Sequence, residues 1–518
     1  MEDSKRLIVG FLLIFMIMVI FQFYTISKQK KTEEPAQDIT VQGEKQAEKK
    51  EFKTDIEPEQ TLTQEKGLEE FFTKRDTTGE REISEKEIVV VETNLLTTYL
   101  NPTGGTLDSI YLKDYKVKFS PLNKTNKLLS TEIIKGNARF PTEMIPFEVQ
   151  IDDIGVEKRV TFSYLLDSLE IKKVYFFRDD SYLIDIQCFP RTEYLHRISC
   201  FDTGEEFPRE AQYSGVVYSV GKKVQNIKKG DLFKGEDRDI SGTIDWSGYK
   251  TKYFFIGIVP DDYITEFTLN KSPDNPIISM RSEPYSRFYF GPLKYPILAS
   301  VKKGLEDAIY FGWGFIRPIS KVIYNFINFL YRYLHNYGIV VIVFAIVMIL
   351  VLSPITMKSF KSMSKMQNLQ PKMQELREKY KSDPKRMNKE TMELYREYGI
   401  NPFSSCLPLF LQFPVFFALY SVLNSSIELK GAPFILWIQD LSMKDPYYIL
   451  PILMGVSMFM QQRFLSPQQK TDQQKIFSFL MPVIITFVFL SFPSGLVLYW
   501  LTYNILMIFV QWYIRKQG

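Results

Sequence analysis

The segment IVVIVFAIVMILVLSPI (residues 339–355) is uncharged, and no charged side chain occurs between Arg332 and Lys358. An α-helix needs about 20 mostly apolar residues to cross the hydrocarbon core of a bilayer. The segment therefore predicts a membrane-spanning helix. Of the 518 residues, 45% are hydrophobic and 24% are charged, so regions outside the membrane are expected as well.

Five other uncharged segments predict further spans, which makes six in all. They occupy residues 7–27, 403–427, 446–462, 476–492 and 494–514. The segments 446–462 and 476–492 are near the lower length limit, which a locally thinned bilayer accommodates. Residues 1–27 are interpreted as an uncleaved signal anchor and not as a cleaved signal peptide, because no small-residue cleavage site follows the apolar core.

The distribution of lysine and arginine predicts the orientation of these spans. The loop 357–402 holds eleven Lys and Arg against six Asp and Glu, whereas the loop 428–444 holds two Lys and is neutral overall. Basic loops stay on the cytoplasmic side. Both termini are then cytoplasmic, and the long region between the first two spans lies on the outer side of the membrane.

Three units are expected in that outside region. Residues 28–85 are rich in Glu, Lys, Gln and Thr and predict a disordered tether. Residues 86–303 show short alternating strands, with a hairpin turn at Arg178–Ser181, and predict an all-β sandwich. Apolar residues at helical spacing in 304–336 predict an amphipathic helix lying in the membrane interface.

Catalytic, metal and nucleic-acid chemistry have little support. The chain has three cysteines and only two histidines, and its net charge of +4 is too small to indicate a nucleic-acid partner. No cofactor or catalytic residue is predicted. Cys188 and Cys200 can either stay free or pair across a hairpin in an oxidising compartment. Trp246 is interpreted as a packed strand residue in preference to a residue that lines a cleft.

Polar side chains recur inside the last four predicted spans. Because a polar group facing lipid is unfavourable, these residues should face inward. They then either join helices by hydrogen bonds or line a hydrophilic groove, and several prolines oppose tight closure of the helices. The candidate groove residues are Gln412, Asn424, Thr486, Tyr499, Thr502, Tyr503, Asn504 and Gln511.

The loop 357–402 predicts a helical hairpin broken at Ser382–Pro384. It is either a solvated hairpin near anionic headgroups or a contact surface, since flexible methionines adapt to many apolar partners. The candidate contact residues are Lys358, Lys361, Met363 and Met366.

Ordered motifs in the C-terminal half resemble one known family. They include SMSKMQ (362–367), LQPK (369–372), QFPV (412–415) and FPSGLVLY (492–499). The chain resembles YidC-type membrane protein insertases of the YidC/Oxa/Albino family, in their Gram-negative form with a large periplasmic domain. The resemblance implies a conserved five-helix core, residues 337–518, around a hydrophilic groove that is open to the cytoplasm and the lipid.

The resemblance also implies a function and partners. The protein would insert, fold and assemble inner-membrane proteins, alone or with the Sec translocon. Its partners would be nascent membrane proteins, the translocon, the ribosome and membrane lipids. A non-catalytic membrane scaffold and a small-solute transporter remain the alternatives. Family members commonly carry an arginine five residues before the proline that corresponds to Pro354, and here that residue is Ile349. Substrate capture is therefore expected to use groove hydrogen bonds and the lysines of the hairpin.

Overall fold

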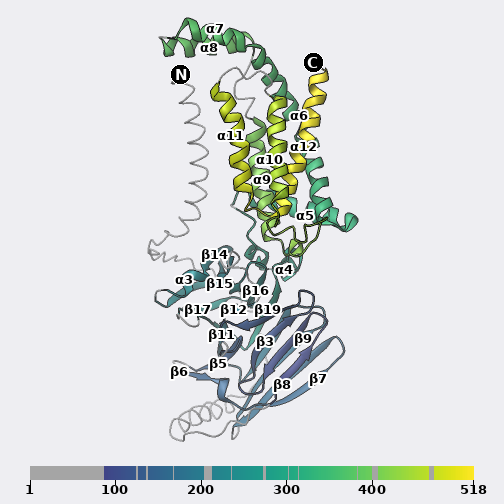
Figure 1. Cartoon of the computed structure of the whole chain (residues 1–518). Coiled ribbons are helices and arrows are strands. Elements are labelled where there is room, and N and C mark those ends of the chain that lie inside the picture. The colour runs from purple at the N-terminus through teal and green to yellow at the C-terminus, as the bar shows by residue number, and fades with distance from the viewer. Residues whose placement is uncertain are drawn as a thin grey trace. The chain divides into compact units, whose positions relative to one another are not determined.

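The computed structural model describes residues 87–517, except for 124–125, 136–137, 167–168, 204–212, 235, 272–275, 302, 313, 382, 400–406 and 466–471. The predicted anchor helix 1–27 and tether 28–85 lie outside the described residues. The described chain consists of strands up to Pro292 and of helices after it (Figure 1). The predicted combination of a β-domain and a helical C-terminal region is confirmed.

The β-domain has two layers of antiparallel strands, which share strand β15. In one layer the strands follow the order β7 (Glu148–Asp153), β8 (Glu157–Leu166), β9 (Leu169–Arg178), β10 (Leu183–Phe189), β19 (Tyr285–Pro292), β16 (Phe254–Ile258), β15 (Arg238–Lys250), β13 (Gly215–Val220) and β14 (Lys223–Lys228). The predicted hairpin turn at Arg178–Ser181 joins β9 to β10.

The second layer returns to the same β15. Its order is β1 (Val89–Glu92), β2 (Leu96–Asn101), β3 (Thr106–Leu112), β5 (Leu129–Lys135), β11 (Glu193–Ser199), β18 (Ile277–Ser282), β17 (Ile264–Asn270) and β15. Strands β4 (Val117–Pro121), β12 (Phe201–Asp202) and β6 (Ala138–Pro141) extend it at its sides. The short helices η1 (Thr142–Met144) and α3 (Lys229–Leu232) lie in connections.

Strand β15 bends from one layer into the other at a bulge. Its register against β17 shifts between Ser241 and Ile244, and Gly242 lies there at φ +132°, a conformation that L side chains rarely adopt. An irregularity of this kind bends a strand and increases its twist. The bulge therefore lets one strand close the sandwich along its edge.

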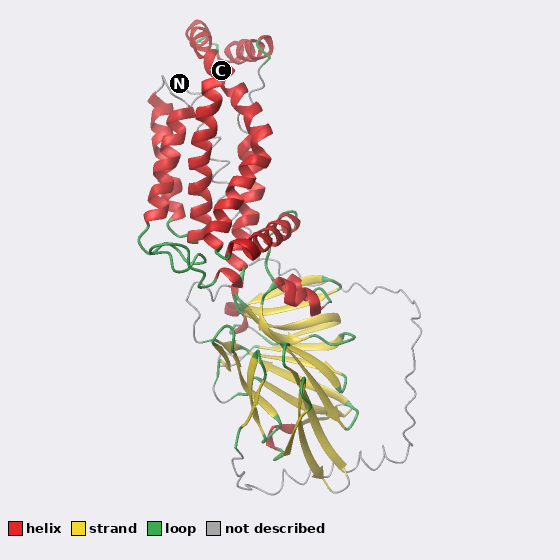
Figure 2. Ribbon diagram, turned by 90° about the vertical axis from the view of Figure 1, so that its right-hand side faces the viewer, coloured by secondary structure: helices red, strands yellow, loops and turns green. Residues whose placement is uncertain are grey.

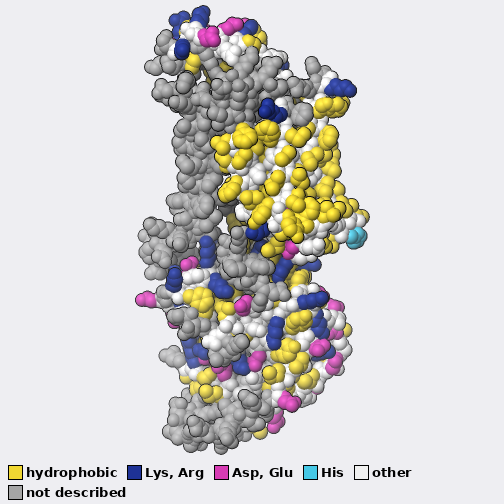
Figure 3. All heavy atoms as spheres, in the orientation of Figure 1, with side chains coloured by type: hydrophobic (Ala, Val, Ile, Leu, Met, Phe, Trp, Pro, Cys, Tyr) yellow, Lys and Arg dark blue, Asp and Glu magenta, His cyan; other side chains and the backbone are white. Residues whose placement is uncertain are grey.

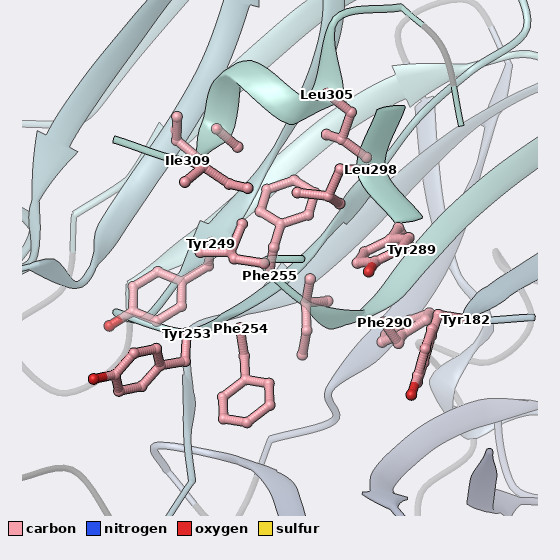
Figure 4. Packing of buried hydrophobic residues seen from close by; sticks show 14 of the residues in the cluster. Tyr182, Tyr249, Tyr253, Phe254, Phe255, Tyr289, Phe290, Leu298, Leu305 and Ile309 are labelled. Carbon is pink, nitrogen blue, oxygen red and sulfur yellow. The ribbon is translucent and has the colours of Figure 1, made fainter. Parts of the chain in front are cut away.

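The β-domain core is aromatic. Trp246 is fully buried, with its ring centroid 5.9 Å from that of Phe255, so the interpretation of Trp246 as a packed residue is confirmed. Figure 4 shows Phe255 near Leu298 of helix α4 (Tyr295–Val301) and Leu305 of η3 (Leu305–Ala308), so these helices close the core at one end.

Two cysteines and a histidine are among the ionisable groups buried in this core. Cys188 and Cys200 are free thiols, which answers the question that the sequence left open, and burial raises the pKa of Cys188 to about 12. His196 is fully buried, and its Nδ1 lies 3.3 Å from the hydroxyl of Thr131. Burial, together with the nearby charge of Lys173, lowers the pKa of His196 to about 3. The imidazole is therefore neutral at physiological pH.

The helical region begins with the amphipathic helix α5 (Arg317–Leu334), which occupies only part of the predicted stretch 304–336. It packs on α9 (Leu407–Ser425) and against α6 (Tyr337–Asn368). After α9 come η5 (Ile427–Leu429), α10 (Ile449–Leu465), α11 (Asp472–Phe489) and α12 (Ser494–Gln517). Helices α6, α9, α10, α11 and α12 run alongside one another as a bundle (Figure 2).

Two described helices are long and apolar enough to cross a membrane by length and composition, in the stretches Tyr337–Met366 and Ser494–Ile514. Shorter apolar stretches lie in α9 and α11, at Leu411–Ser425 and Phe479–Phe489. The predicted count of six spans is therefore not settled by helix length and composition.

Helix α6 extends into the stretch 357–402, which the sequence analysis assigns to the hairpin. The helix continues without a break to Asn368, because nothing in its lysine, serine and methionine residues opposes helical backbone bonding. The predicted break at Ser382–Pro384 is confirmed, since α7 (Gln370–Lys379) ends before it and α8 (Pro384–Glu397) begins after it. The Asp383 side chain accepts a hydrogen bond from the backbone N–H of Arg386 and so caps α8.

Pro354 lies inside α6 and cannot donate a backbone hydrogen bond. The hydroxyl of Ser353 donates instead to the carbonyl of Leu350, at 2.8 Å. The hydroxyl of Thr356 donates to the carbonyl of Leu352, at 2.9 Å. Side-chain hydroxyls thus satisfy carbonyls around the proline, which keeps the helix intact there.

The connection between α9 and α10 packs closely on the start of α6. A Cβ atom added at Gly338 would lie 1.9 Å from Cδ2 and 2.3 Å from Cγ of the Phe434 ring. Phe434 is anchored by a backbone hydrogen bond from its N–H to the carbonyl of Ile438. The Phe434 ring can therefore pack in this position only because residue 338 is a glycine.

We expect the β-domain to lose stability in mild acid because of His196. Its ordinary pKa of 6.5 falls to about 3 on folding. The unfolded chain therefore binds more protons between these pH values, and stability is complete above pH 6.5 and falls below it. The loss at pH 5 should be about 2 kcal/mol, measured by chemical unfolding of the detergent-solubilised protein. In His196→Leu the difference in the free energy of unfolding between pH 7 and pH 5 should be smaller than in the wild type. An unchanged difference would show that His196 does not cause the loss of stability in acid. His335→Leu, at an exposed position, is the control.

We expect Gly338→Ala to destabilise the helical region by about 1–3 kcal/mol, because the new methyl group would displace the Phe434 ring. Helix propensity alone favours alanine over glycine by about 1 kcal/mol, so the two effects have opposite signs. Thermal unfolding in detergent measures the outcome. Gly314→Ala is the matched control, since no atom lies within 4 Å of its added Cβ. A Gly338→Ala protein as stable as this control would show that the fit is not tight.

Candidate functional site in the helical bundle

A hydrogen bond between two predicted groove residues joins α9 to α12. The amide Nε2 of Gln412 donates to the hydroxyl of Tyr499 at 2.8 Å, and both side chains are buried. The Tyr499 ring centroid lies 6.1 Å from that of Tyr503, one turn further along α12, and 5.7 Å from that of Phe344 on α6. Three helices therefore meet around one polar contact in otherwise apolar surroundings.

A second contact joins α10 to α12. The amide Nδ2 of Asn504 lies 3.3 Å from the hydroxyl oxygen of Ser457, and both residues are buried. Ser457 was not among the predicted groove residues. A serine in an apolar helix is a weak signal, because its hydroxyl often bonds to its own helix, as Ser457 also does to the carbonyl of Met454.

The bundle interior contains buried amides that the described residues do not satisfy. The Oε1 atoms of Gln412 and Gln462 have no hydrogen-bond partner among the described residues, nor does either amide atom of Gln511. Buried polar atoms in native proteins nearly always have a partner, in the protein or in ordered water. This interior therefore has more hydrogen-bonding capacity than the described side chains use.

Among the described residues, the remaining predicted groove residues add no hydrogen bond to this group. Asn424 lies at the other end of α9, where its Nδ2 donates to the hydroxyl of Tyr213 at 3.0 Å. The hydroxyl of Thr486 donates to the carbonyl of Pro482 in its own helix, and its oxygen lies against Gly455 of α10. Thr502 and Tyr503 are half-buried. Thr486 is therefore a packing residue between α10 and α11.

An aromatic cluster, which the sequence analysis missed, lies next to the polar group. The Phe416 ring centroid is 5.2 Å from that of Trp500 and 6.0 Å from that of Phe489, and Phe492 contacts both Phe489 and Tyr420. These rings come from α9, α11, α12 and the turn before α12. They fill the space that leads from the polar contact toward the α11–α12 turn.

The interior carries no fixed charge on α6. Ile349 is buried, and between Tyr337 and Met357 this helix has no charged residue. Lys358 and Lys361 follow as the first cations, and both are exposed on the continuation of α6. Met366 is half-buried there, and the side chain of Met363 lies outside the described residues.

The described residues contain no arrangement of side chains that could bind a metal ion. No group of three or more His, Cys, Asp or Glu side chains between residues 87 and 517, apart from the undescribed gaps, could hold a metal ion.

Comparison with known proteins identifies the family. The family model described as the 60Kd inner membrane protein matches residues 329–518, and the one described as the YidC periplasmic domain matches residues 88–325. The membrane protein insertase YidC of Syntrophus aciditrophicus is 37% identical over 470 residues, covering 83% of this chain and 85% of that protein. The YidC of Campylobacter jejuni is 34% identical and covers 80% of each chain.

Among solved structures, the crystal structure of an active YidC insertase with its first transmembrane domain resolved covers 83% of this chain and 93% of that chain. Its sequence identity is 18% and its TM-score 0.40. The fold and the sequence relatives together define an inner-membrane protein with a periplasmic β-domain and a helical membrane region. The chain belongs to the YidC family of membrane protein insertases.

We expect Tyr499→Phe to destabilise the bundle by about 1–3 kcal/mol, because it leaves the second end of the buried Gln412 amide without a partner. Unfolding in detergent, followed by the helical signal of circular dichroism, measures the change. Tyr503→Phe on the same helix face is the matched control, since Tyr503 is only half-buried. Equal stability of the two variants would contradict a stabilising role for the Gln412–Tyr499 contact.

Proposed function

We propose that this protein inserts and folds membrane proteins by giving their polar segments a hydrated path among α6, α9, α10 and α12. The buried Gln412–Tyr499 contact, with unused hydrogen-bonding capacity beside it, carries the proposal. The relatives that cover most of the chain are named membrane protein insertases, which supports the same function.

The proposed membrane placement has six spans, with both termini in the cytoplasm. The apolar stretches of α6 and α12 support two of the spans. On the face shown in Figure 3, hydrophobic side chains gather over the helices, whereas charged side chains gather at the hairpin and over the β-domain. The spans 446–462 and 476–492, which correspond to α10 and α11, are near the lower length limit, and we assign them to a locally thinned bilayer.

The physical effect of such an interior is to shorten the dehydrated path. A polar segment crossing hydrocarbon loses its water, and each unsatisfied group then costs several kcal/mol. The side-chain amides of Gln412, Gln462 and Gln511, which have atoms without a hydrogen-bond partner among the described residues, hold water or bind the segment directly. The free-energy barrier to insertion is therefore lowered without a covalent step. The aromatic cluster around Phe416 closes the opposite end against leakage.

Capture of the substrate uses cations outside the bundle, because α6 carries no charge within its span. Lys358 and Lys361 are the first cations beyond it, and they attract acidic segments toward the entrance. Nascent membrane proteins are the proposed substrates, and the Sec translocon, the ribosome and membrane lipids are proposed partners. A scaffold or a solute transporter accounts less well for unfilled amides in a bundle whose relatives are insertases.

We expect the double variant Gln412→Leu/Asn504→Leu to insert substrates at least about tenfold more slowly, because it removes both interhelical amides and dries the interior. Insertion of a model membrane protein into proteoliposomes, scored by protease protection, measures the rate. The matched control is Asn325→Leu/Gln439→Leu, which makes the same chemical changes at exposed positions. Wild-type insertion by the Gln412/Asn504 variant would refute the hydrated path.

A further inference from the structure

A cavity of about 380 Å³ lies where the hairpin closes on the end of α6, and the proposed function does not use it. Its lining residues are Lys365, Asn368, Leu369, Lys372 and Tyr398. They come from the end of α6, the start of α7 and the C-cap of α8. The motifs SMSKMQ and LQPK each contribute one lysine, and the fold places these two lysines at the same cavity.

Contacts between the two ends of the hairpin shape this cavity. The ammonium of Lys372 donates a hydrogen bond to the hydroxyl of Tyr398 and lies 4.7 Å from the centroid of its ring. The hydroxyl of Tyr395 lies 3.2 Å from the sulfur of Met373. The end of α8 is therefore held against the start of α7, so the cavity belongs to the closed hairpin and not to either helix alone.

The lining chemistry selects an anion. Two ammonium groups, one amide and one phenol can all donate hydrogen bonds, and no carboxylate lines the cavity. Neither lysine has a carboxylate within 4 Å among the described residues of the hairpin. Hydrogen bonding to Tyr398, with smaller effects of Glu397 and Glu375, raises the pKa of Lys372, so its ammonium stays charged at physiological pH. Charge-assisted hydrogen bonds of this kind are the strong ones.

The height of the cavity favours a polypeptide over a lipid headgroup. Lys365 lies ten residues beyond Ile355, the end of the apolar segment, which is about 15 Å along the helix at 1.5 Å per residue. The headgroup layer is only about 5–8 Å thick on each side of the bilayer. In the proposed membrane placement, with the hydrocarbon boundary at Ile355, the cavity therefore lies beyond the lipid phosphates, in the water that nascent chains cross.

The small size of the cavity and the apolar Leu369 in its lining favour a carboxylate in a short apolar peptide segment as the ligand, in preference to a nucleic-acid backbone. A phosphate backbone is bound by many cations along a groove. Here two cations flank a small cavity with buried Leu369 at its base. An acidic residue with an apolar neighbour matches this arrangement.

We propose that this hairpin cavity binds the carboxylate of an acidic segment in the substrate polypeptide, with Lys365 and Lys372 as its cations, before that segment enters the bundle. The inference rests on the proposed function for the identity of the substrate. It places first capture one to two helical turns beyond Lys358 and Lys361, and it gives a chain without a charge in the α6 span a means of selecting acidic segments.

Peptide binding tests the proposal directly. The full-length protein in nanodiscs of zwitterionic lipid is titrated with a short fluorescent peptide that carries an Asp-Asp pair among alanines and leucines, and with its Asn-Asn counterpart. We expect the Asp-Asp peptide to bind about tenfold more tightly at low salt. Lys365→Gln/Lys372→Gln should abolish this preference, and Tyr398→Phe should reduce it about threefold. The matched control Lys381→Gln/Lys389→Gln removes the same charge from exposed positions of the hairpin and should keep the preference.

An unchanged preference in Lys365→Gln/Lys372→Gln would overturn the proposal. So would competition by inorganic phosphate, dispersed short-chain phosphatidylglycerol or an RNA oligonucleotide as strong as that by the unlabelled Asp-Asp peptide, since the site would then be a phosphate site. Insertion assays separate this result from the proposed function. The lysine variant should insert a substrate with a neutral tail at the wild-type rate. Failure of the wild-type protein to insert any substrate would refute the proposed function and leave the peptide result standing.

Discussion

One hydrogen bond inside an apolar bundle, from Gln412 to Tyr499, organises the helical region. In water such a contact contributes little, because each group can bond to solvent instead. Among helices that pack by van der Waals contact alone, a buried amide has few other partners, so its position constrains which helix faces meet. Helices α6, α9 and α12 converge at this point. The Oε1 atom of the same amide has no partner among the described residues, so the contact that holds the helices together also leaves the interior polar.

Much of the architecture follows from local sequence. Charge-free segments locate the start of α6 and both ends of α9 to α12 to within a few residues, and the alternation around Arg178–Ser181 locates a hairpin, because apolar periodicity reflects each element's own burial. The charge-free segment does not reveal that α6 continues to Asn368, because a helix needs apolar residues only to cross lipid and not to continue beyond it. The break before Pro384 was found because proline and an N-cap residue act locally.

The contacts of the candidate site were less predictable. Eight polar residues were named from the sequence, yet among the described residues only Gln412, Tyr499 and Asn504 join bundle helices by hydrogen bonds, while Thr486 bonds to its own helix. A single sequence shows that a residue is polar but not which helix it faces. Ser457 and the aromatic cluster were missed for the same reason. The meeting of two motif lysines around one cavity depends on how the hairpin closes, which no spacing along the chain reveals.

Helix α6 has a mechanical consequence. Its 32 residues form a rod of about 48 Å that, in the proposed membrane placement, passes from the membrane interior to the hairpin, with Pro354 near the bilayer surface. At Pro354 a backbone bond is missing, and the hydroxyls of Ser353 and Thr356 bond to nearby carbonyls. The rod can therefore flex at that joint without exposing backbone to lipid. A force on the hairpin then moves the part of α6 beyond Pro354, whereas the part before Pro354, which packs beside Tyr499, stays in place.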